Sequence, residues 1–400
     1  MYCKVLPPRG LYHPILPYRS GNKLLFPLCG ECAQQKDQGL CKHSDDKRAL
    51  EGTWVTLELQ KAVERGYRVV EIYEVWHFES FTLYDPNRAY APTSRFSIFP
   101  SKQCINAFLK MKQEADWWPQ DCHAEEEKMA YVADYEAREG VKLESIEKNE
   151  GRRCLAKLML NSFWGKFGQR DNLPHKEIVT DMTRLVELAN DENKETTLNR
   201  IKEDFIELTW SDKEPFVETG TTKNIFIAAY TTAQVRLKLY SHLERLNDMV
   251  LYFDTDSIIY VSRPGTHEQS LGKFWGHMAD ELSKPLGEGS FITRFVAGGP
   301  KNYAYEVYST KSGDTTTLCK VRGITLAPDA ERVINFETMA RMLEHVQNGQ
   351  SKEDIVVTKK HDMIRRGMGQ ICSAPTQKRY RIVYDKRVIQ SDYTTLKYGY

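Results

Sequence analysis

The chain has 400 residues, of which 41% are hydrophobic and 28% are charged, so it is long enough for two or three domains and has the composition of a globular protein. Its formal net charge is only +1, which excludes a global basic field as the means of binding nucleic acid; a polyanion site would be a local groove. No apolar run reaches the length of about 18 residues that a membrane-spanning helix needs, and the N-terminal residues lack the apolar core of a secretory signal.

The first feature in chain order is a cysteine–histidine cluster in residues 29–43. Cys29 and Cys32 form one pair of potential ligands, and Cys41 and His43 form a second. Four such ligands suit a tetrahedral zinc ion, which would be structural because no ligand position stays open. The alternative is a loop with free thiols. The odd total of nine cysteines favours metal ligands or free thiols over a disulfide framework, and therefore an intracellular protein.

The pattern of apolar residues predicts both helices and strands. A strand rich in β-branched and aromatic residues is expected over 67–78 and a β-hairpin over 249–262, while the polar segment 171–222 is typical of a variable surface subdomain. Gly66 suits the end of the first helix. Helices are expected over 54–66, 104–116, 124–140, 152–169, 226–247 and 331–348. This mixture predicts an α+β fold.

The expected hairpin carries two aspartates at its tip, Asp254 and Asp256, between two apolar β-branched runs. Apolar strands on both sides would hold the carboxylates on a rigid platform. Carboxylates two residues apart suit Mg²⁺, and in two-metal phosphoryl transfer they hold the ions that activate the attacking oxygen and stabilise the leaving one. The alternative is an ordinary turn that uses Asp because Asp favours turns.

The helix expected over 152–169 has one polar face. At about 100° per residue, Arg153, Lys157, Asn161 and Trp164 share this face. Two cations can bind the phosphates of a nucleoside triphosphate, and the indole and the small Gly165 can meet a base pair. The alternative is an amphipathic helix with a solvated polar face. Against it, Asn, Ser and Gly are poor helix formers in the middle of the pattern.

A lysine and a tyrosine stand at the start of a further strand. Lys301 and Tyr303 are two residues apart, so they share a face of the strand and both can contact one nucleic-acid backbone. Taken alone, this pair is also compatible with ordinary turn-to-strand chemistry.

Together these segments resemble motifs of the family B DNA polymerases. Tyr-x-Asp-Thr-Asp-Ser around Asp254 resembles motif C, and Lys-Leu-Met-Leu-Asn-Ser followed by Gly165 resembles motif B in its protein-primed form. Gly-Gly-Pro-Lys-Asn-Tyr resembles the Lys-x-Tyr motif, and the segment 271–275 resembles the linker between the last two motifs. The resemblance covers nearly the whole chain and is greatest to the protein-primed polymerases of large eukaryotic self-replicating transposons, organelles and related viruses.

The resemblance implies roles for individual residues. Asp254 and Asp256 would be catalytic and would bind Mg²⁺. Lys157 would contact the incoming triphosphate, with Lys112 as the second triphosphate lysine, and Trp164 stands where the family usually has Tyr, so base selection would differ. The implied nucleotide-binding residues are Lys112, Arg153, Lys157, Asn161 and Trp164. The implied DNA-binding residues are Ser162 and Gly165 at the template and Lys301 and Tyr303 at the primer end.

The fold implied by the resemblance is a partial right-hand polymerase of palm, fingers and thumb with an N-terminal insertion subdomain. The expected divisions are an insertion with the Cys/His cluster at 1–100, fingers at 101–170, a second insertion at 171–222, a palm at 223–326 and a thumb at 327–400. Motif A, Asp-x-x-Ser-Leu-Tyr-Pro, which carries the other metal-binding carboxylate, does not occur in the sequence. The segment 83–86 has its Asp after the Tyr instead. We therefore expect a C-terminal fragment, without motif A and the exonuclease domain, that has little or no activity alone.

The expected function is DNA-directed DNA synthesis, with nucleotidyl transfer from a dNTP to a primer 3′ end or to a priming protein through two Mg²⁺ ions. The expected partners are primer–template DNA, dNTPs and a terminal priming protein, with no membrane, and the expected location is the nucleus. Two other functions stay open: a non-catalytic DNA-binding remnant, and a zinc-organised module that docks a priming protein. The intact B and C motifs favour the polymerase, because drift would have blurred them.

Overall fold

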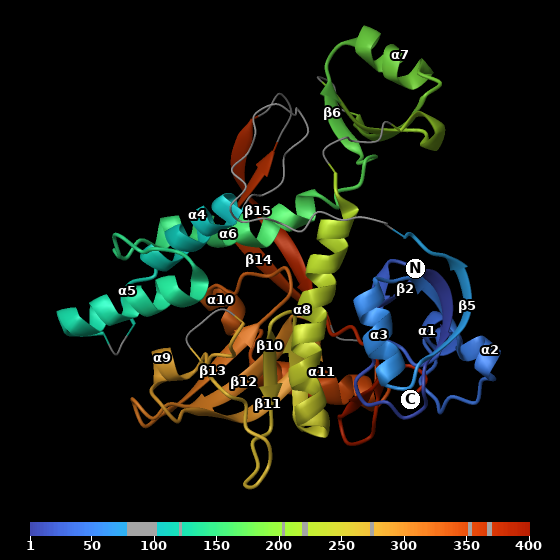
Figure 1. Cartoon of the computed structure of the whole chain (residues 1–400). Helices are drawn as coiled ribbons and strands as arrows, with labels where there is room; N and C mark the ends of the chain where they lie inside the picture. Colours follow the sequence, from blue (N-terminus) through green and yellow to red (C-terminus); the bar gives the residue numbers. More distant parts are fainter. Residues whose placement is uncertain are drawn as a thin grey trace. The chain divides into compact units, whose positions relative to one another are not determined.

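The structure is a computed structural model of the whole chain. It describes residues 1–77, 102–119, 122–201, 205–217, 223–272, 276–350, 354–365 and 370–400. The described residues contain both helices and antiparallel strands, so the fold is α+β as predicted (Figure 1). The chain divides into two compact units. Unit 1 consists of Met1–Glu79, Thr232–Asp362 and Ala374–Tyr400, and unit 2 consists of Ser80–Thr231 and Met363–Ser373.

The N-terminal part of unit 1 is a three-stranded sheet in the order β4-β1-β5, formed by Leu50–Thr53, Tyr2–Leu6 and Arg68–Glu74. Helix α3, Thr56–Glu64, lies within the helix predicted over 54–66. Gly66 follows it in the left-handed conformation with φ of +87°, as predicted for a residue just past a helix end. The core beneath combines Val5, Leu50 and Trp54 with Tyr240 from helix α8, Ile225–Leu246. The segment Met1–Glu79 therefore packs, within unit 1, against residues much later in the sequence.

Short elements connect this sheet to the cysteine–histidine cluster. Strands β2, Tyr18–Ser20, and β3, Lys23–Leu25, form a hairpin. Helix α1, Gly30–Gln35, and helix α2, Asp45–Arg48, follow it. The buried Arg48 donates to the backbone oxygens of Pro7 and Leu28, which ties this segment to the chain before β2.

The central part of unit 1 has two strand systems. Strands β9, Val250–Asp254, and β10, Ser257–Tyr260, form the predicted hairpin, with the 3₁₀ turn η2, Asn247–Met249, before it. Strands β11, Phe291–Gly299, β12, Asn302–Tyr308, and β13, Thr315–Lys320, form an antiparallel sheet. One face of this sheet is covered by helix α11, Phe336–Gln347, through a core that includes Val296, Ala304 and Met339.

The helix predicted near 331–348 is present as α11 but begins later, at Phe336. A single turn, α10, Pro328–Glu331, ends before α11 begins, because the side chain of Asn335 accepts a hydrogen bond from Thr338 N and caps the new helix. The short helix α9, Ser283–Leu286, precedes the sheet. Strands β14, Ile355–Arg365, and β15, Ile371–Tyr380, pair with each other. Near the C-terminus β16, Val388–Ile389, pairs with β17, Thr395–Leu396.

Unit 2 contains three longer helices and a small sheet. The predicted helices are present as α4, Lys102–Glu114, α5, Glu125–Glu139, and α6, Glu150–Lys166. The polar segment predicted as a surface subdomain folds into a sheet in the order β6-β8-β7, with a core of Val179, Leu188 and Leu208. Its elements are β6, His175–Val179, α7, Met182–Asn190, β7, Lys194–Ile201, β8, Ile206–Asp212, and the 3₁₀ turn η1, Glu214–Phe216.

Among the residues that the structure describes, none of the helices combines the length and the apolar character needed to span a lipid bilayer. The assignment of stretches of the chain to insertions, fingers, palm and thumb stays a prediction.

Candidate functional site

The cysteine–histidine cluster forms around helix α1. Cys29 caps the N-terminus of the helix, and its sulfur accepts a hydrogen bond from Cys32 N. Cys41 and His43 return from the following loop, so that the four ligand atoms lie within 4.8 Å of one another. The Nδ1 atom of His43 is 3.5 Å from Cys29 Sγ, 3.3 Å from Cys32 Sγ and 3.8 Å from Cys41 Sγ. The predicted convergence of the four side chains is confirmed.

This geometry fits a tetrahedral metal ion. With metal–sulfur bonds of about 2.3 Å and metal–nitrogen bonds of about 2.0 Å, tetrahedral ligand atoms are separated by roughly 3.5 to 3.8 Å. The three cysteines are buried, and no further ligand position is needed, so the cluster could hold a metal such as zinc in a structural role.

Protonation of the three thiols opposes metal binding to different degrees. Burial raises the pKa of Cys29 and of Cys32. Burial acts in the same direction on Cys41, but hydrogen bonds with His43 and with the other two thiols outweigh it and lower the pKa of Cys41 to about 7. Because metal binding needs thiolates, an ion at this cluster would displace protons, and its affinity would rise with pH.

The aspartate hairpin places its two acids differently. Asp254 ends β9 and is partly exposed, whereas Asp256 lies in the turn and is exposed. The turn is tight, with Asp256 N donating to Asp254 O at 2.6 Å. Thr255 has a φ of +56°, a left-handed conformation that is costly for a β-branched residue. The constrained turn therefore leaves Asp256 exposed and Asp254 partly exposed.

A second hairpin meets the first in unit 1. Lys301, in the turn between β11 and β12, donates its backbone N–H to the hydroxyl of Tyr252 at 2.8 Å, and its Nζ lies 3.4 Å from Asp254 Oδ2. The ring of Tyr303 lies 4.8 Å from that of Tyr252, centroid to centroid, and both pack against Phe295. The structure thus brings together Asp254, Lys301 and Tyr303, three of the predicted residues. Tyr252 and Phe295 were not predicted as site residues; the only signal in the sequence was the presence of aromatic residues on β9 and β11.

A group of basic residues lies between α4 and α6 in unit 2. Arg153 Nε is 2.6 Å from Asp116 Oδ1, a contact that the sequence analysis missed although Asp116 stands four residues after Lys112. Burial lowers the pKa of Lys112; the charges of Arg153 and Lys157 lower it further, against the opposing charge of Asp116. The predicted triphosphate-binding residues Lys112, Arg153 and Lys157 are therefore close enough to interact electrostatically.

The remaining predicted residues of α6 face outward or are half-buried. Asn161 and Ser162 are exposed, and Trp164 is half-buried. A methyl group at Gly165 would meet nothing within 4 Å in the described part of the chain, so packing against these residues does not require glycine there. This openness is compatible with a residue that leaves room for a ligand.

The predicted residues thus form two groups, one in each unit. Asp254, Asp256, Lys301 and Tyr303 belong to unit 1, and the residues of α4 and α6 belong to unit 2. That the two groups build one active site stays a prediction. The segments 83–86 and 273–275, named in the sequence analysis, lie outside the described residues.

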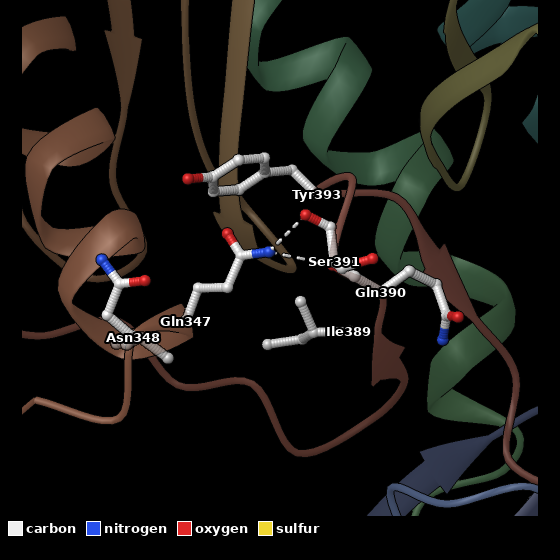
Figure 2. Close-up of a pocket in the computed structure, with 7 residues that line it drawn as sticks. Gln347, Asn348, Ile389, Gln390, Ser391 and Tyr393 are labelled. Carbon is white, nitrogen blue, oxygen red and sulfur yellow. Dashed lines mark hydrogen bonds between the residues drawn. The ribbon is translucent and has the colours of Figure 1, made fainter.

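One open pocket of about 520 Å³ lies between the end of α11 and the β16–β17 turn, and Figure 2 shows its lining. Gln347 donates hydrogen bonds to the backbone oxygens of Gln390 and Ser391 across it. The pocket contains no carboxylate, amine, imidazole or thiol, so it lacks the groups needed for acid–base or metal chemistry. None of the predicted residues is among those that line it, which are Val346, Gln347, Asn348, Ile389, Gln390, Ser391 and Tyr393.

Comparisons of the chain with protein-family models, with curated proteins and with solved structures find no match. Its function is therefore argued from the residues themselves.

Proposed function

We propose that the chain carries the nucleotide-binding and primer-binding parts of a DNA-directed DNA polymerase of the protein-primed family B, with a partial right-hand fold. One observation carries the proposal: the β9–β10 hairpin with Asp254 and the β11–β12 hairpin with Lys301 and Tyr303 meet in one unit. The two hairpins carry motifs about 50 residues apart in sequence, and the contact between them supports the interpretation of the second motif, which was weak when taken alone.

The chemistry at the hairpins suits a primer end. Asp254 and Asp256 provide hard oxygen ligands for Mg²⁺. The Lys301 side chain is 64% exposed and within reach of Asp254, so it can compensate the carboxylate charge in the absence of an ion and contact a phosphate when DNA binds. Tyr252 and Tyr303 both have a raised pKa, caused mainly by burial, so their hydroxyls stay neutral hydrogen-bonding groups at physiological pH.

The α4–α6 group supports triphosphate binding. Lys112 is disfavoured in its charged form by burial and by two neighbouring cations, and a polyphosphate would relieve this repulsion. Asp116 holds Arg153 in place, which reduces the side-chain freedom lost when a ligand binds. The open space at Gly165 and the half-buried indole of Trp164 lie on the same helix and suit a base.

The first test measures nucleotide binding by the chain alone. Lys157→Met should weaken binding of a fluorescent dNTP by about ten-fold, because a charge-assisted contact to phosphate is worth roughly 1.5 kcal/mol or more. The matched control is Lys166→Met, an exposed lysine in the last turn of the same helix. Equal losses in the two variants, or no dNTP binding by the wild type, would contradict the triphosphate assignment.

The second test measures catalysis. Two-metal transfer needs carboxylates from two strands, and this sequence supplies the strand of Asp254 and Asp256, so the chain alone should bind primer–template DNA in a salt-sensitive manner and extend it negligibly. A longer chain in which a segment with Asp-x-x-Ser-Leu-Tyr-Pro precedes Met1 should synthesise DNA with Mg²⁺. In that chain Asp256→Asn should lower the rate by several powers of ten, whereas Asp248→Asn, an exposed acid just before the hairpin, should not. Normal synthesis by Asp256→Asn would rule the mechanism out.

The same measurements separate the alternatives. DNA binding without dNTP binding, and no synthesis by the longer chain, would identify a non-catalytic DNA-binding protein.

A further inference from the structure

The C-terminal residues of the chain pack directly on the cysteine–histidine cluster. The buried side chains of Cys29, Cys32 and Cys41 share one hydrophobic core with Val388 and Tyr398. Tyr398 is 1% exposed, so the cluster is sealed by a residue more than 350 positions away in sequence. The ligands and the C-terminal segment 385–400 therefore cannot change position independently.

The backbones also meet. Leu28 N, immediately before the first ligand, donates to Tyr398 O at 2.8 Å. Gly399 has a φ of +84°, and a Cβ atom added to it would lie 2.3 Å from the Cβ of Cys29 and 2.5 Å from Cys29 N. Both the backbone conformation and the contact require glycine at this position.

The loop between the two ligand pairs holds the segment from the other side. Gln38 donates to the backbone oxygen of Arg387 at 3.4 Å and accepts from Ile389 N at 3.3 Å. The side-chain amide of Gln38 thus pairs with the backbone of residues 387–389 through two hydrogen bonds, as a neighbouring strand would. Further along, Lys386 donates to Leu24 O and Asp385 pairs with Lys23, so contacts continue to the start of the segment.

This loop has little of its own to keep it ordered. Helix α1 has six residues, too few to be stable in isolation, and Leu40 is 77% exposed. Without an ion, hydrogen bonds to His43 hold the three cysteines together. Bonds from one ion to three thiolates and the imidazole are far stronger, so a bound ion would order this loop much more firmly.

We propose that a metal ion bound by Cys29, Cys32, Cys41 and His43 stabilises the packing of residues 385–400 on the N-terminal part of the chain, so that loss of the ion releases the C-terminal segment. This inference does not depend on the polymerase assignment. Binding is reciprocal: if the ion favours the docked segment, the docked segment must favour the ion by the same factor.

The first experiment follows amide hydrogen exchange of the full chain with bound zinc, after removal of the ion with a chelator, and after zinc is returned. Removal should raise exchange by about ten-fold or more in residues 29–43 and 385–400, and return of zinc should reverse it. Exchange in the unit 2 sheet, β6 to β8, should not change, which shows that the chain has not simply unfolded. Unchanged protection of 385–400 without the ion, or protein that holds no stoichiometric metal, would overturn the proposal.

The second experiment uses two glycines with the same backbone strain. Gly399→Ala and Gly349→Ala both place alanine at a left-handed position, with φ of +84° and +68°. Gly399 contacts the cluster, whereas no described residue lies within 4 Å of a Cβ at Gly349. By reciprocity Gly399→Ala should weaken zinc affinity about ten-fold in competition with a fluorescent chelator, and Gly349→Ala should leave it unchanged. Equal zinc affinity in both variants would show that the ion and the C-terminal segment are not coupled.

Discussion

The cysteine–histidine cluster and the aspartate hairpin are both short motifs suited to cations, but the structure completes only one of them. The cluster gathers four ligand atoms within 4.8 Å from 15 residues of sequence, with its cysteines buried. At the hairpin, Asp256 is exposed and Asp254 faces an ammonium group. Within the residues that the structure describes, the cluster is the only group of three or more His, Cys, Asp or Glu side chains arranged to hold an ion.

This difference is the one expected if the cluster is a structural site and the hairpin is, as proposed above, one part of a catalytic site. A structural ion stabilises the fold, so all of its ligands must come from the protein and be held in place by it. A catalytic ion must keep positions open for substrate, and its carboxylates come from separate strands. A hairpin with one exposed and one partly exposed aspartate is therefore what a single strand of such a catalytic site would contribute. Substitutions at the cluster and at the hairpin both test this comparison.

The largest effect is expected at the complete site. Cys32→Ser removes a buried ligand, so the free energy of metal binding is no longer available to folding, and we expect unit 1 to lose on the order of 5 kcal/mol of stability. Stoichiometric zinc measured by mass spectrometry should fall from one ion per chain to none, with a thermal midpoint lower by about 10 °C or more.

Cys154→Ser is the matched control, because this cysteine is exposed on α6. It should keep the ion and the thermal midpoint of the wild type. If both variants retained one zinc per chain, the ion would be bound elsewhere and the cluster would be a set of free thiols.

Two lysines allow a similar comparison between a buried and an exposed position, Lys397 and Lys311. Lys397 is 3% exposed, and its Nζ has no hydrogen-bond partner among the residues that the structure describes. It lies 3.7 Å above the ring of Tyr12, close to Arg387, His13 and Tyr400. Burial and, to a smaller degree, the charge of Arg387 lower its pKa to about 6. The unfolded chain has an ordinary lysine pKa of about 10.4, so between about pH 6 and 10 it binds more protons than the folded chain, and stability rises with pH.

Lys397→Met should remove this cost. We expect the free energy of unfolding at pH 7 to increase by several kcal/mol, up to about 4, because folding at that pH requires this lysine to lose its proton and each pH unit below its ordinary pKa costs about 1.4 kcal/mol. The gain should shrink as the pH rises towards about 10.4, the ordinary lysine pKa, above which Lys397 is neutral in both the folded and the unfolded chain; urea denaturation from pH 6 to 10 measures this decrease. Lys311→Met, at an exposed position, should change stability little at any pH. A gain that is constant over this range would exclude titration of Lys397 as its cause.

Short-range patterns explain what was predictable from sequence. The helix expected over 152–169 is present as Glu150–Lys166, and the hairpin expected over 249–262 as β9 and β10, because helix and strand periods are properties of consecutive residues. The cluster converges as predicted for the same reason: two pairs of ligands at short spacing need only one turn of helix and one loop to meet.

Contacts between distant residues were not predictable in this way. Nothing local to Tyr398 indicates that it covers the cluster, and the pairing of Asp116 with Arg153 depends on how α4 packs on α6. The contact of Lys301 N with the Tyr252 hydroxyl is similar: each motif was recognised separately, but their meeting depends on how two hairpins pack. Such contacts are set by tertiary packing.

The smallest effect is expected at the aspartate hairpin, where a bound ion would have to replace the positive charge of Lys301. Lys301 Nζ is 3.4 Å from Asp254 Oδ2, and both side chains are accessible, so the pair is worth at most about 1 kcal/mol and is weakened by salt. An ion that binds Asp254 must displace this ammonium group.

Lys301→Met should therefore increase the affinity of the chain for Mn²⁺, used as a spectroscopic substitute for Mg²⁺, by a few-fold at low salt, with a smaller gain at high salt. The exposed Lys320→Met, on β13 of the same sheet, provides the comparison. Binding should be lost when Asp254 and Asp256 are both changed to Asn. If Lys301→Met weakened Mn²⁺ binding instead, Lys301 would be contributing to the ion site. Asp254 and Asp256 would then have to bind the ion in an arrangement in which Asp254 does not face Lys301.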